Sequence, residues 1–391
     1  MASPTIDAQI PGSLNAPALA EYAKLFNIEV GQVLDHLLTS TAFGATSTSI
    51  GAAYWGFNHR NTPTPIPINR DGNGLVFFTR PDLNLSSSNI RHYRAMNALQ
   101  TEAEVSLPRI FRSYLDPELG NTNFNGGGAL APLTCPLVDN LQAFIPLLTN
   151  TCISMSGFED IDAPVAVTKA GAYGESMSHV DGLSDKYGIY EITSTFRNMV
   201  GDPVTMLVYY WIKYMTAVRQ GLMIPRFKNI FENRIDYQTR IYRLSLDHSR
   251  TYVQKIACTG ASTPKFSPIG AAMNFEADKP FNASNDQVSI TWTGHGLYYM
   301  DDFIIRSFNS TVKMFNPGMD TIKYYPATIN QAAHYSSPSY TKIPMNSLTL
   351  FNNKGYPLIL PETLELSWWV KTSEFNQVIN GAIPPQMRNQ L

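Results

Sequence analysis

The residues best suited to chemistry are the acids of one short stretch, FEDIDAPV, which contains Glu159, Asp160 and Asp162. Paired carboxylates can act as acid and base in glycoside hydrolysis or bind Ca²⁺, although these acids lack the spacing of an EF-hand loop. Further along, His179 and Asp181 of SMSHVDGLSD could orient each other. No serine lies in the sequence context of a triad nucleophile. We therefore expect no catalytic residue and interpret the acidic stretch as a solvated or intersubunit loop.

The familiar signatures of cofactor and metal sites are missing from the sequence. There is no Walker loop, Rossmann fingerprint, H-E-x-x-H or G-x-S-x-G motif. The seven histidines include no i, i+4 pair, and the cysteines form no C-x-x-C pair. We expect no cofactor, no metal and no disulfide framework. Cys135, Cys152 and Cys258 are predicted to be small core residues.

The composition favours a protein whose surface is covered by neighbouring subunits. The 391 residues are 44% hydrophobic and 12% aromatic, but only 15% are charged, against about 25% in typical soluble domains. Interfaces favour aromatic residues and exclude charge. The net charge of −2 gives no global basic field for nucleic acid. No secretory signal is expected, and the most apolar stretch, 203–218, is too short to span a membrane, so no membrane partner is expected.

Residues 201–260 carry a local basic bias. They hold nine Lys and Arg against four Asp and Glu, so 9 − 4 = +5. This charge could contact nucleic acid or an acidic partner, but we favour salt bridges to neighbouring subunits, because the planar fork of arginine holds carboxylates well. The candidate intersubunit residues are Arg234, Arg240, Arg243 and Tyr237, together with Asp160, Asp162 and Asp181.

The hydrophobic pattern predicts mostly helices in the first third of the chain. Apolar residues at steps of three and four predict a helix over 21–44. A short strand at 75–85, broken by Pro81, precedes a helical region over 86–118. The Gly- and Asn-rich stretch at 119–134 is predicted to be a flexible loop or a domain edge.

From about Cys135 onward the pattern is that of strands and one long helix. Alternating residues predict a strand over 187–199. The helix should begin with Asp202 as N-cap and Pro203 at its first position, and it should end at Gly221. Its sequence is apolar on almost all sides, which predicts burial on several sides.

Further strands are predicted after this helix. A hairpin over 231–264 should turn at 247–250, and strand candidates follow at 268–276, 287–300 and 362–372. In the 287–300 strand, Val288, Ile290 and Trp292 alternate with a polar face made of Ser289, Thr291, Thr293 and His295.

Several blocks between about Asp160 and Met319 resemble, in order and spacing, the tube-domain proteins of contractile bacteriophage tails. The blocks are YGESMSHVDGLSDKYGIYEITSTFRNMVGDPVTMLVYYWIKYM, NRIDYQTRIYRLSLD, YVQKIACTGASTPKFSPIGAAMNF and ITWTGHGLYYMDD. Upstream, GLVFFTRPDLNL and AFIPLLTN are similar to the longer members, which lie at the baseplate–tube junction of large phages.

The resemblance implies an α+β fold: an antiparallel β-barrel or sandwich with a packed helix, preceded by an extension of helices and loops. We therefore expect an extension over 1–134, a tube-like domain over 135–320 with its helix near 203–220, and a C-terminal extension over 321–391 with a strand near 362–372.

The resemblance also implies a structural virion protein without enzymatic activity, assembled in the host cytoplasm. Six copies would form a ring with the tail tube subunit above and the baseplate hub protein below. Genomic DNA would pass transiently through the lumen, which Ser289, Thr291, Thr293 and His295 are expected to face. The chain is longer than main tube subunits, which favours a ring that joins the tube to the baseplate or initiates it.

Four other interpretations stay open at this point. The chain could be the main tail tube, or a neck, collar or capsid protein with the same composition and another symmetry. A tail-associated hydrolase would need a carboxylate pair or metal cluster in a cleft. A secreted carbohydrate-binding β-domain fits poorly with an odd number of cysteines.

Overall fold

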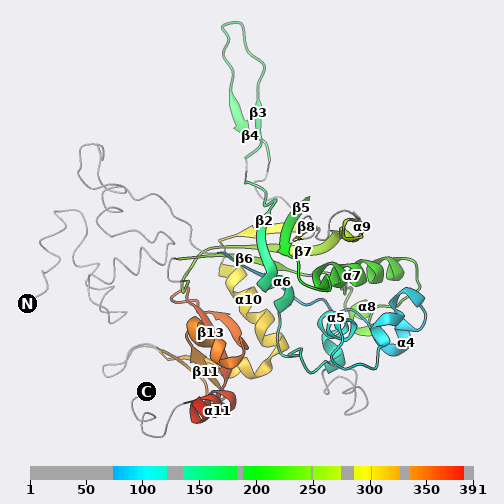
Figure 1. Cartoon of the computed structure of the whole chain (residues 1–391). Coiled ribbons are helices and arrows are strands. Elements are labelled where there is room, and N and C mark those ends of the chain that lie inside the picture. The colour runs from blue at the N-terminus through cyan, green and yellow to red at the C-terminus, as the bar shows by residue number, and fades with distance from the viewer. Residues whose placement is uncertain are drawn as a thin grey trace, which may run out of the picture. The chain divides into compact units, whose positions relative to one another are not determined.

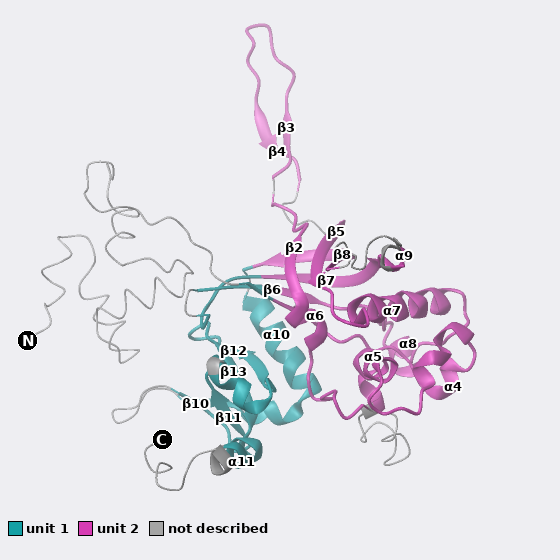
Figure 2. Ribbon diagram, viewed as in Figure 1, with its two compact units in different colours: residues 1–75, 244–256, 300–391 teal, residues 76–243, 257–299 magenta. Residues whose placement is uncertain are grey.

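The computed structural model describes residues 74–120, 135–161, 163–182, 188–247, 250–273, 286–300, 302–325 and 334–382. The predicted helix over 21–44 and the candidate Asp162 lie outside these ranges. The chain forms two compact units, shown in Figure 2. Unit 2 holds residues 76–243 and 257–299, and unit 1 holds residues 1–75, 244–256 and 300–391. The division at residues 134 and 320 stays a prediction.

Among the described residues, the main sheet has six strands in the order β1-β6-β7-β8-β5-β2 (Figure 1). Strand β2 pairs with β5, β5 with β8, and β8 with β7, all antiparallel. The predicted α+β class with an antiparallel sheet is therefore confirmed. The strands are β1 Gly74–Phe78, β2 Cys152–Ser156, β5 Ile189–Arg197, β6 Ile241–Leu246, β7 Val253–Phe266 and β8 Gln287–Tyr299.

The core of unit 2 lies between this sheet and helix α7, Pro203–Arg219. The buried rings of Trp211 on α7 and Trp292 on β8 meet edge to face with centroids 5.7 Å apart. The indole N–H of Trp211 donates to the carbonyl of Tyr237 at 2.9 Å. Pro203 opens the helix as predicted, but the Asp202 side chain accepts from Asn198 instead of capping the helix. Asp202 has a φ of 48°, in the left-handed region, whereas a capping residue usually has an extended backbone.

The helical region predicted over 86–118 forms as several short helices, and further short helices occur at 146–151 and 227–231. They are α4 Ser87–Ile90, the 3-10 segments η3 Arg94–Gln100 and η4 Pro117–Gly120, α5 Leu107–Leu115, α6 Pro146–Thr151 and α8 Phe227–Phe231. The strand predicted at 268–276 was wrong, because α9 Ile269–Ala272 forms there. The hairpin predicted from residue 231 begins only at Ile241, since α8 and a loop occupy the residues before it.

A separate hairpin leaves unit 2 between β2 and β5 (Figure 1). It consists of β3 Val165–Val167 and β4 Ser178–Val180, which pair antiparallel with Val165 opposite Val180. We refer to residues 159–182 as the arm. Most of its described side chains are exposed, so the fold of unit 2 gives the arm no core of its own.

Unit 1 contains helix α10 and a small sheet with the order β11-β13-β12. Asn309 of α10 holds β12 by two hydrogen bonds, to the carbonyl (2.7 Å) and from the N–H (2.9 Å) of Ile359. The elements are α10 Asp302–Phe315, η7 Pro317–Thr321, β9 Lys323–Tyr325, β10 His334–Ser336, β11 Tyr340–Ile343, η8 Met345–Phe351, β12 Tyr356–Ile359, β13 Leu366–Lys371 and α11 Thr372–Ala382. The strand predicted at 362–372 is β13, but both of its faces contain buried residues.

Two further observations concern the side chains and helices that the structure describes. Cys135 and Cys258 are buried as predicted, whereas Cys152 is half-buried, and all three are free thiols. Burial raises the pKa of Cys258 to about 12 and that of Cys152 to about 11. No helix in the described ranges is long and apolar enough to cross a membrane.

Candidate assembly surfaces and a buried ion cluster

Strand β8 has one buried face and one wet face. Val288, Ile290 and Trp292 are buried. The polar residues Ser289, Thr291, Thr293 and His295 lie on the opposite face and are exposed or half-buried. Strand β5 continues this polar face, because Thr193 pairs with Thr291 and Glu191 pairs with Thr293. The sheet therefore presents a surface of small polar side chains on the side away from its core.

The described acidic candidates, Glu159, Asp160 and Asp181, lie at the two ends of the arm. Asp160 and Asp181 are exposed, and the N–H of Asp181 donates to the carbonyl of Pro164 at 2.8 Å. His179 is exposed on β4. At the first of these ends, the hydroxyl of Tyr299 donates to the carbonyl of Glu159. Among the described residues, no group of three or more His, Cys, Asp or Glu is placed to hold a metal.

The basic candidates lie in the loop between α8 and β6 and on β6 itself, and they are engaged within the chain. Arg234, 67% exposed at its side chain, follows α8 and pairs with Glu232 at 3.1 Å. Arg240 donates from Nε to the carbonyl of Gly260 at 3.2 Å. Arg243 is half-buried on β6, and Tyr237 packs against the core. Their role in contacts between subunits stays a prediction.

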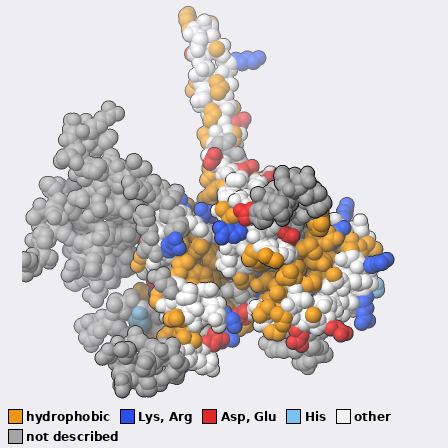
Figure 3. All heavy atoms as spheres, viewed as in Figure 1, with side chains coloured by type: hydrophobic (Ala, Val, Ile, Leu, Met, Phe, Trp, Pro, Cys, Tyr) orange, Lys and Arg blue, Asp and Glu red, His pale blue; other side chains and the backbone are white. Residues whose placement is uncertain are grey.

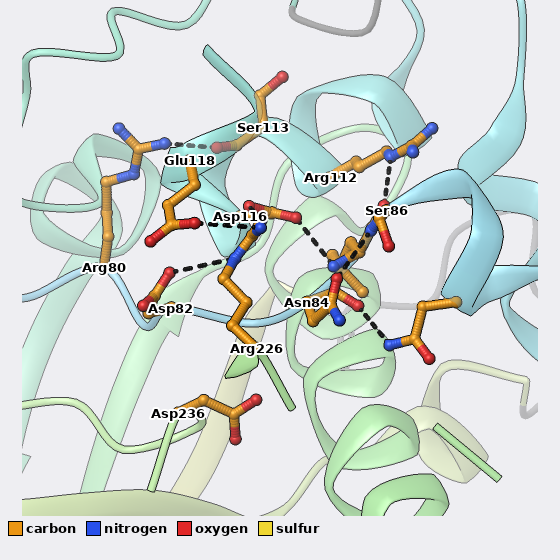
Figure 4. A network of polar contacts seen from close by, with 12 residues as sticks. Arg80, Asp82, Asn84, Ser86, Arg112, Ser113, Asp116, Glu118, Arg226 and Asp236 are labelled. Carbon is orange, nitrogen blue, oxygen red and sulfur yellow. Dashed lines mark hydrogen bonds and ion pairs between the residues drawn. The ribbon is translucent and has the colours of Figure 1, made fainter. Parts of the chain in front are cut away.

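The main charged feature of unit 2 is a buried cluster that the sequence analysis did not predict (Figure 4). One guanidinium, that of Arg226, contacts three carboxylates. It pairs with Asp116, with Glu118 at 3.1 Å and with Asp82 at 3.6 Å. Asp116 is fully buried, and its other oxygen accepts the N–H of Leu85 at 2.8 Å. The cluster thus connects the loop before α8 to the loops after β1 and α5.

Two more buried arginines extend the cluster by donating to backbone carbonyls (Figure 4). Arg80 donates to Tyr114 (3.1 Å) and Gln142 (3.2 Å), among others. Arg112 donates to the carbonyl of Leu85 at 2.9 Å and to that of Leu99 at 3.3 Å. These donors satisfy carbonyls of loop residues and of the last turns of η3 and α5, where the helix itself supplies no partner. The network therefore fixes the loops and helix ends that it connects.

Burial shifts the ionisation of these groups. Desolvation raises the pKa of Asp82, Asp116 and Glu118, although Arg226 opposes the shift in each case. Desolvation would lower the pKa of Arg226, but the three acids outweigh it and the pKa is raised. Desolvation lowers the pKa of Arg80 and of Arg112 to about 10. All three arginines thus remain charged at neutral pH.

Beside the cluster, Asp236 gives a testable pH dependence. Burial raises its pKa from 3.8 to about 6, while its hydrogen bond from Tyr214 partly opposes the shift. A raised folded pKa means that the folded state keeps the proton longer, so stability falls as pH rises from about 4 to about 6. Asp236→Asn should remove up to about 3 kcal/mol of this loss.

The measurement is urea denaturation of the wild type and of Asp236→Asn at pH 4 and pH 7. Asparagine retains an acceptor for the hydroxyl of Tyr214. The variant should therefore lose less stability between pH 4 and pH 7 than the wild type does. Asp181→Asn on the exposed arm is the matched control, for which no such difference is expected. Equal pH profiles for the wild type and Asp236→Asn would refute this assignment.

Apolar side chains are exposed on two parts of unit 2, the helical part and the arm (Figure 3). Helix α8 turns Phe227, Ile230 and Phe231 outward while it buries Asn229, whose amide donates to Asp82 at 3.0 Å. On the arm, Val165, Val167 and Val180 are exposed. Monomeric proteins rarely expose contiguous apolar patches of this kind unless a partner covers them.

Comparison with known proteins gives the chain a family. The family described as "Putative phage tail tube protein" matches residues 14–383. Among solved structures, the cap of the anti-feeding prophage, its tube terminating cap, matches 40% of this chain and 82% of its own at 13% identity, with a TM-score of 0.25. The sheath/tube terminator of the PVC extracellular contractile injection system, in its extended state, matches 41% of this chain and 88% of its own at 14% identity, also with a TM-score of 0.25. No curated protein matches.

Proposed function

The chain belongs to the phage tail tube family and is a structural protein of the virion tail, and we propose that it forms a hexameric ring that joins the tail tube to the baseplate or initiates the tube. Further partners in this proposal are the tail tube subunit above the ring and the baseplate hub protein below it. No cofactor takes part. The family is structural, so the protein has no need of the catalytic groups discussed for the acidic stretch.

The observation that carries this proposal is the two-faced strand pair β5–β8. A sheet that lines a wet channel needs a buried face for its own core and a second face of side chains that tolerate water. Ser289, Thr291 and Thr293 provide the second face, and Ile290 and Trp292 provide the first. Small hydroxyl side chains carry no charge, which suits transient passage of DNA without tight binding, because tight binding depends on Lys and Arg at phosphates.

The size of the chain supports a specialised ring over a repeating tube subunit. Unit 1 adds helices α10 and α11 and a separate sheet to the tube-like part. A ring at the junction would contact different proteins on its two sides, and additional elements supply surface for a second kind of contact. The copy number of six rests on the resemblance of the sequence to tube-domain proteins.

The proposal predicts a ring from the purified full chain. Native mass spectrometry should show a species of six copies, and negative-stain images should show a closed ring with a central hole. Arg243→Glu, with reversed charge on β6, should reduce the fraction of rings if this candidate residue contacts a neighbour, whereas Lys354→Glu in unit 1 is a charge-matched control. A closed ring of another symmetry, such as twelve copies, would favour a neck or collar protein. If the fraction of rings is unchanged in Arg243→Glu, Arg243 does not take part in the contact between subunits.

A further inference from the structure

We propose that the exposed face of helix α8 is the docking site for the arm of a second copy of this chain. This inference deepens the proposed function, on which it rests, by assigning both halves of one contact between subunits. The docking face consists of Phe227, Ile230 and Phe231 on α8, and the exposed Leu222, Ile224 and Ile235 flank the helix in the sequence. The arm is the occupant, through Val165, Val167, Val180, Tyr173 and Met177, which are also exposed.

The apolar stripe of helix α8 faces solvent, whereas in a monomeric protein it would face the core. Phe227, Ile230 and Phe231 stand at positions i, i+3 and i+4, so they share one helix face. In a monomeric domain such a stripe faces the core, yet Phe227 is 80% exposed and Phe231 is 82% exposed. The polar residue Asn229 is buried instead and is bound to Asp82.

The orientation of this helix is enforced by the buried ion cluster. Arg226 immediately precedes α8, and its guanidinium is held by Asp82, Asp116 and Glu118. These contacts fix the loop on the core side, so α8 cannot rotate its phenylalanines inward without exposing buried charges. Unit 2 thus uses buried electrostatics to keep an apolar surface exposed, which is the arrangement that a binding face needs.

The arm offers an apolar strip of matching kind. Val165 lies directly opposite Val180 in the β3–β4 ladder, and Val167 lies two residues along the same strand. Directly opposed residues and residues two apart share one face of a ladder. All three valines therefore project from the same side, and Tyr173 at the tip is 98% exposed. The pairing of β3 with β4 does not cover these valine side chains, which stay exposed.

Charge identifies which apolar surface of a second copy receives the arm. Residues 159–182 hold five acids and one lysine, so their charge is 1 − 5 = −4. Residues 219–235 hold four basic residues and one acid, so 4 − 1 = +3, of which Arg226 is offset by its buried partners. Arg234 pairs with Glu232, which leaves Arg219 and Lys228 as exposed basic residues close to α8 in the sequence, and opposite charges across an interface steer association.

Another exposed apolar surface of unit 2 has the wrong charge for an acidic arm. It includes Val105, Val200 and Met273, and part of it is a pocket of about 280 Å³ lined by Leu107, Phe111 and Met206. The chain beside this surface carries Glu102, Glu104 and Asp202. An acidic arm would be repelled there, and so this surface serves as the control site.

The test is photo-crosslinking of the assembled full chain. Phe231→p-benzoylphenylalanine places a reactive group on the docking face, and Met273→p-benzoylphenylalanine places it on the control surface. Two isotopically distinct populations of each variant are mixed during assembly, irradiated and digested, so that mass spectrometry separates links between copies from links within one. We expect links from position 231 to residues 161–181 of another copy, and none from position 273 to that segment.

A complementation experiment tests the same contact without a crosslinker. Phe227→Ser with Phe231→Ser should weaken self-association by about 30-fold or more, the factor expected for loss of one hot spot. Val165→Ser, Val167→Ser and Val180→Ser together should do the same from the arm side. A mixture of the two variants should form pairs, because each supplies the surface that the other lacks. Val200→Ser with Met273→Ser should associate like the wild type.

Each other result overturns the inference. Links from position 231 to a different segment, links only within one copy, or no links at all would each show that the arm does not dock on α8. Variants that associate normally, or a mixture that does not pair, would show the same. These outcomes differ from a failure of the proposed function: a chain with arm–α8 links that is absent from phage tails would refute only the tail position.

Discussion

Arg226→Met is expected to lower the free energy of unfolding by about 3–5 kcal/mol, the cost of removing one partner from a buried ion pair. The guanidinium of Arg226 forms the ion pairs of Asp82, Asp116 and Glu118 in this cluster. Methionine fills similar space but leaves the buried carboxylate of Asp116 without a counter-charge. The loss should shrink as pH falls, because the carboxylates, whose pKa values are already raised by burial, can then take up protons.

The measurement is urea denaturation followed by tryptophan fluorescence, in which the buried Trp211 and Trp292 report on unit 2. Arg234→Met is the matched control, because Arg234 lies eight residues away and pairs with Glu232 at the surface. Exposed ion pairs contribute less than about 1 kcal/mol. If both variants lose the same stability, the cluster does not hold the loops of unit 2, and the orientation of α8 needs another cause.

Trp292→Ala should cost about 3–5 kcal/mol, as large-to-small changes of buried aromatic residues do. The Trp292 ring is fully buried and lies 5.3 Å from the ring of Phe78 and 5.7 Å from that of Trp211, measured between centroids. Its indole N–H donates to the hydroxyl of Ser194 at 2.6 Å. Alanine would leave a cavity at the place where strands β1 and β8 and helix α7 meet.

Thr293→Ala tests the adjacent residue on the opposite face of β8. Surface substitutions away from special features usually change stability by less than about 0.5 kcal/mol, so this control should unfold like the wild type. Both variants are compared by the same denaturation experiment. If Thr293→Ala lowers the free energy of unfolding strongly and Trp292→Ala lowers it only slightly, the buried and solvent-exposed faces of β8 have been assigned the wrong way round.

The sequence predicted the elements whose signals are local and periodic. Strand β8 alternates between buried and more exposed residues from Gln287 to Gly296, and Trp292 falls on the buried face as expected. Helix α7 is a long apolar run that starts at Pro203. By contrast, the segment from Ile269 to Ala272 is too short for its period to separate a strand from a turn of helix, and the prediction there was wrong.

The buried ion cluster could not be predicted for a different reason. Arg226 is 144 positions from Asp82 and 110 from Asp116, so no spacing in the sequence connects them. Charged residues are rarely fully buried, which makes each of them look like a surface residue when it is taken alone. Helix α8 misleads in the opposite direction, because its i, i+3, i+4 apolar stripe is typical of a core-facing helix, and here the stripe is exposed.

The proposed ring at the baseplate end of the phage tail is tested by the position of the protein in intact particles. Immunogold labelling with antibody against the purified chain, imaged by electron microscopy, gives that position. We predict gold confined to the baseplate end of the tail. Gold along the whole tail would make the chain the main tube subunit, and gold at the head–tail neck would contradict the junction role.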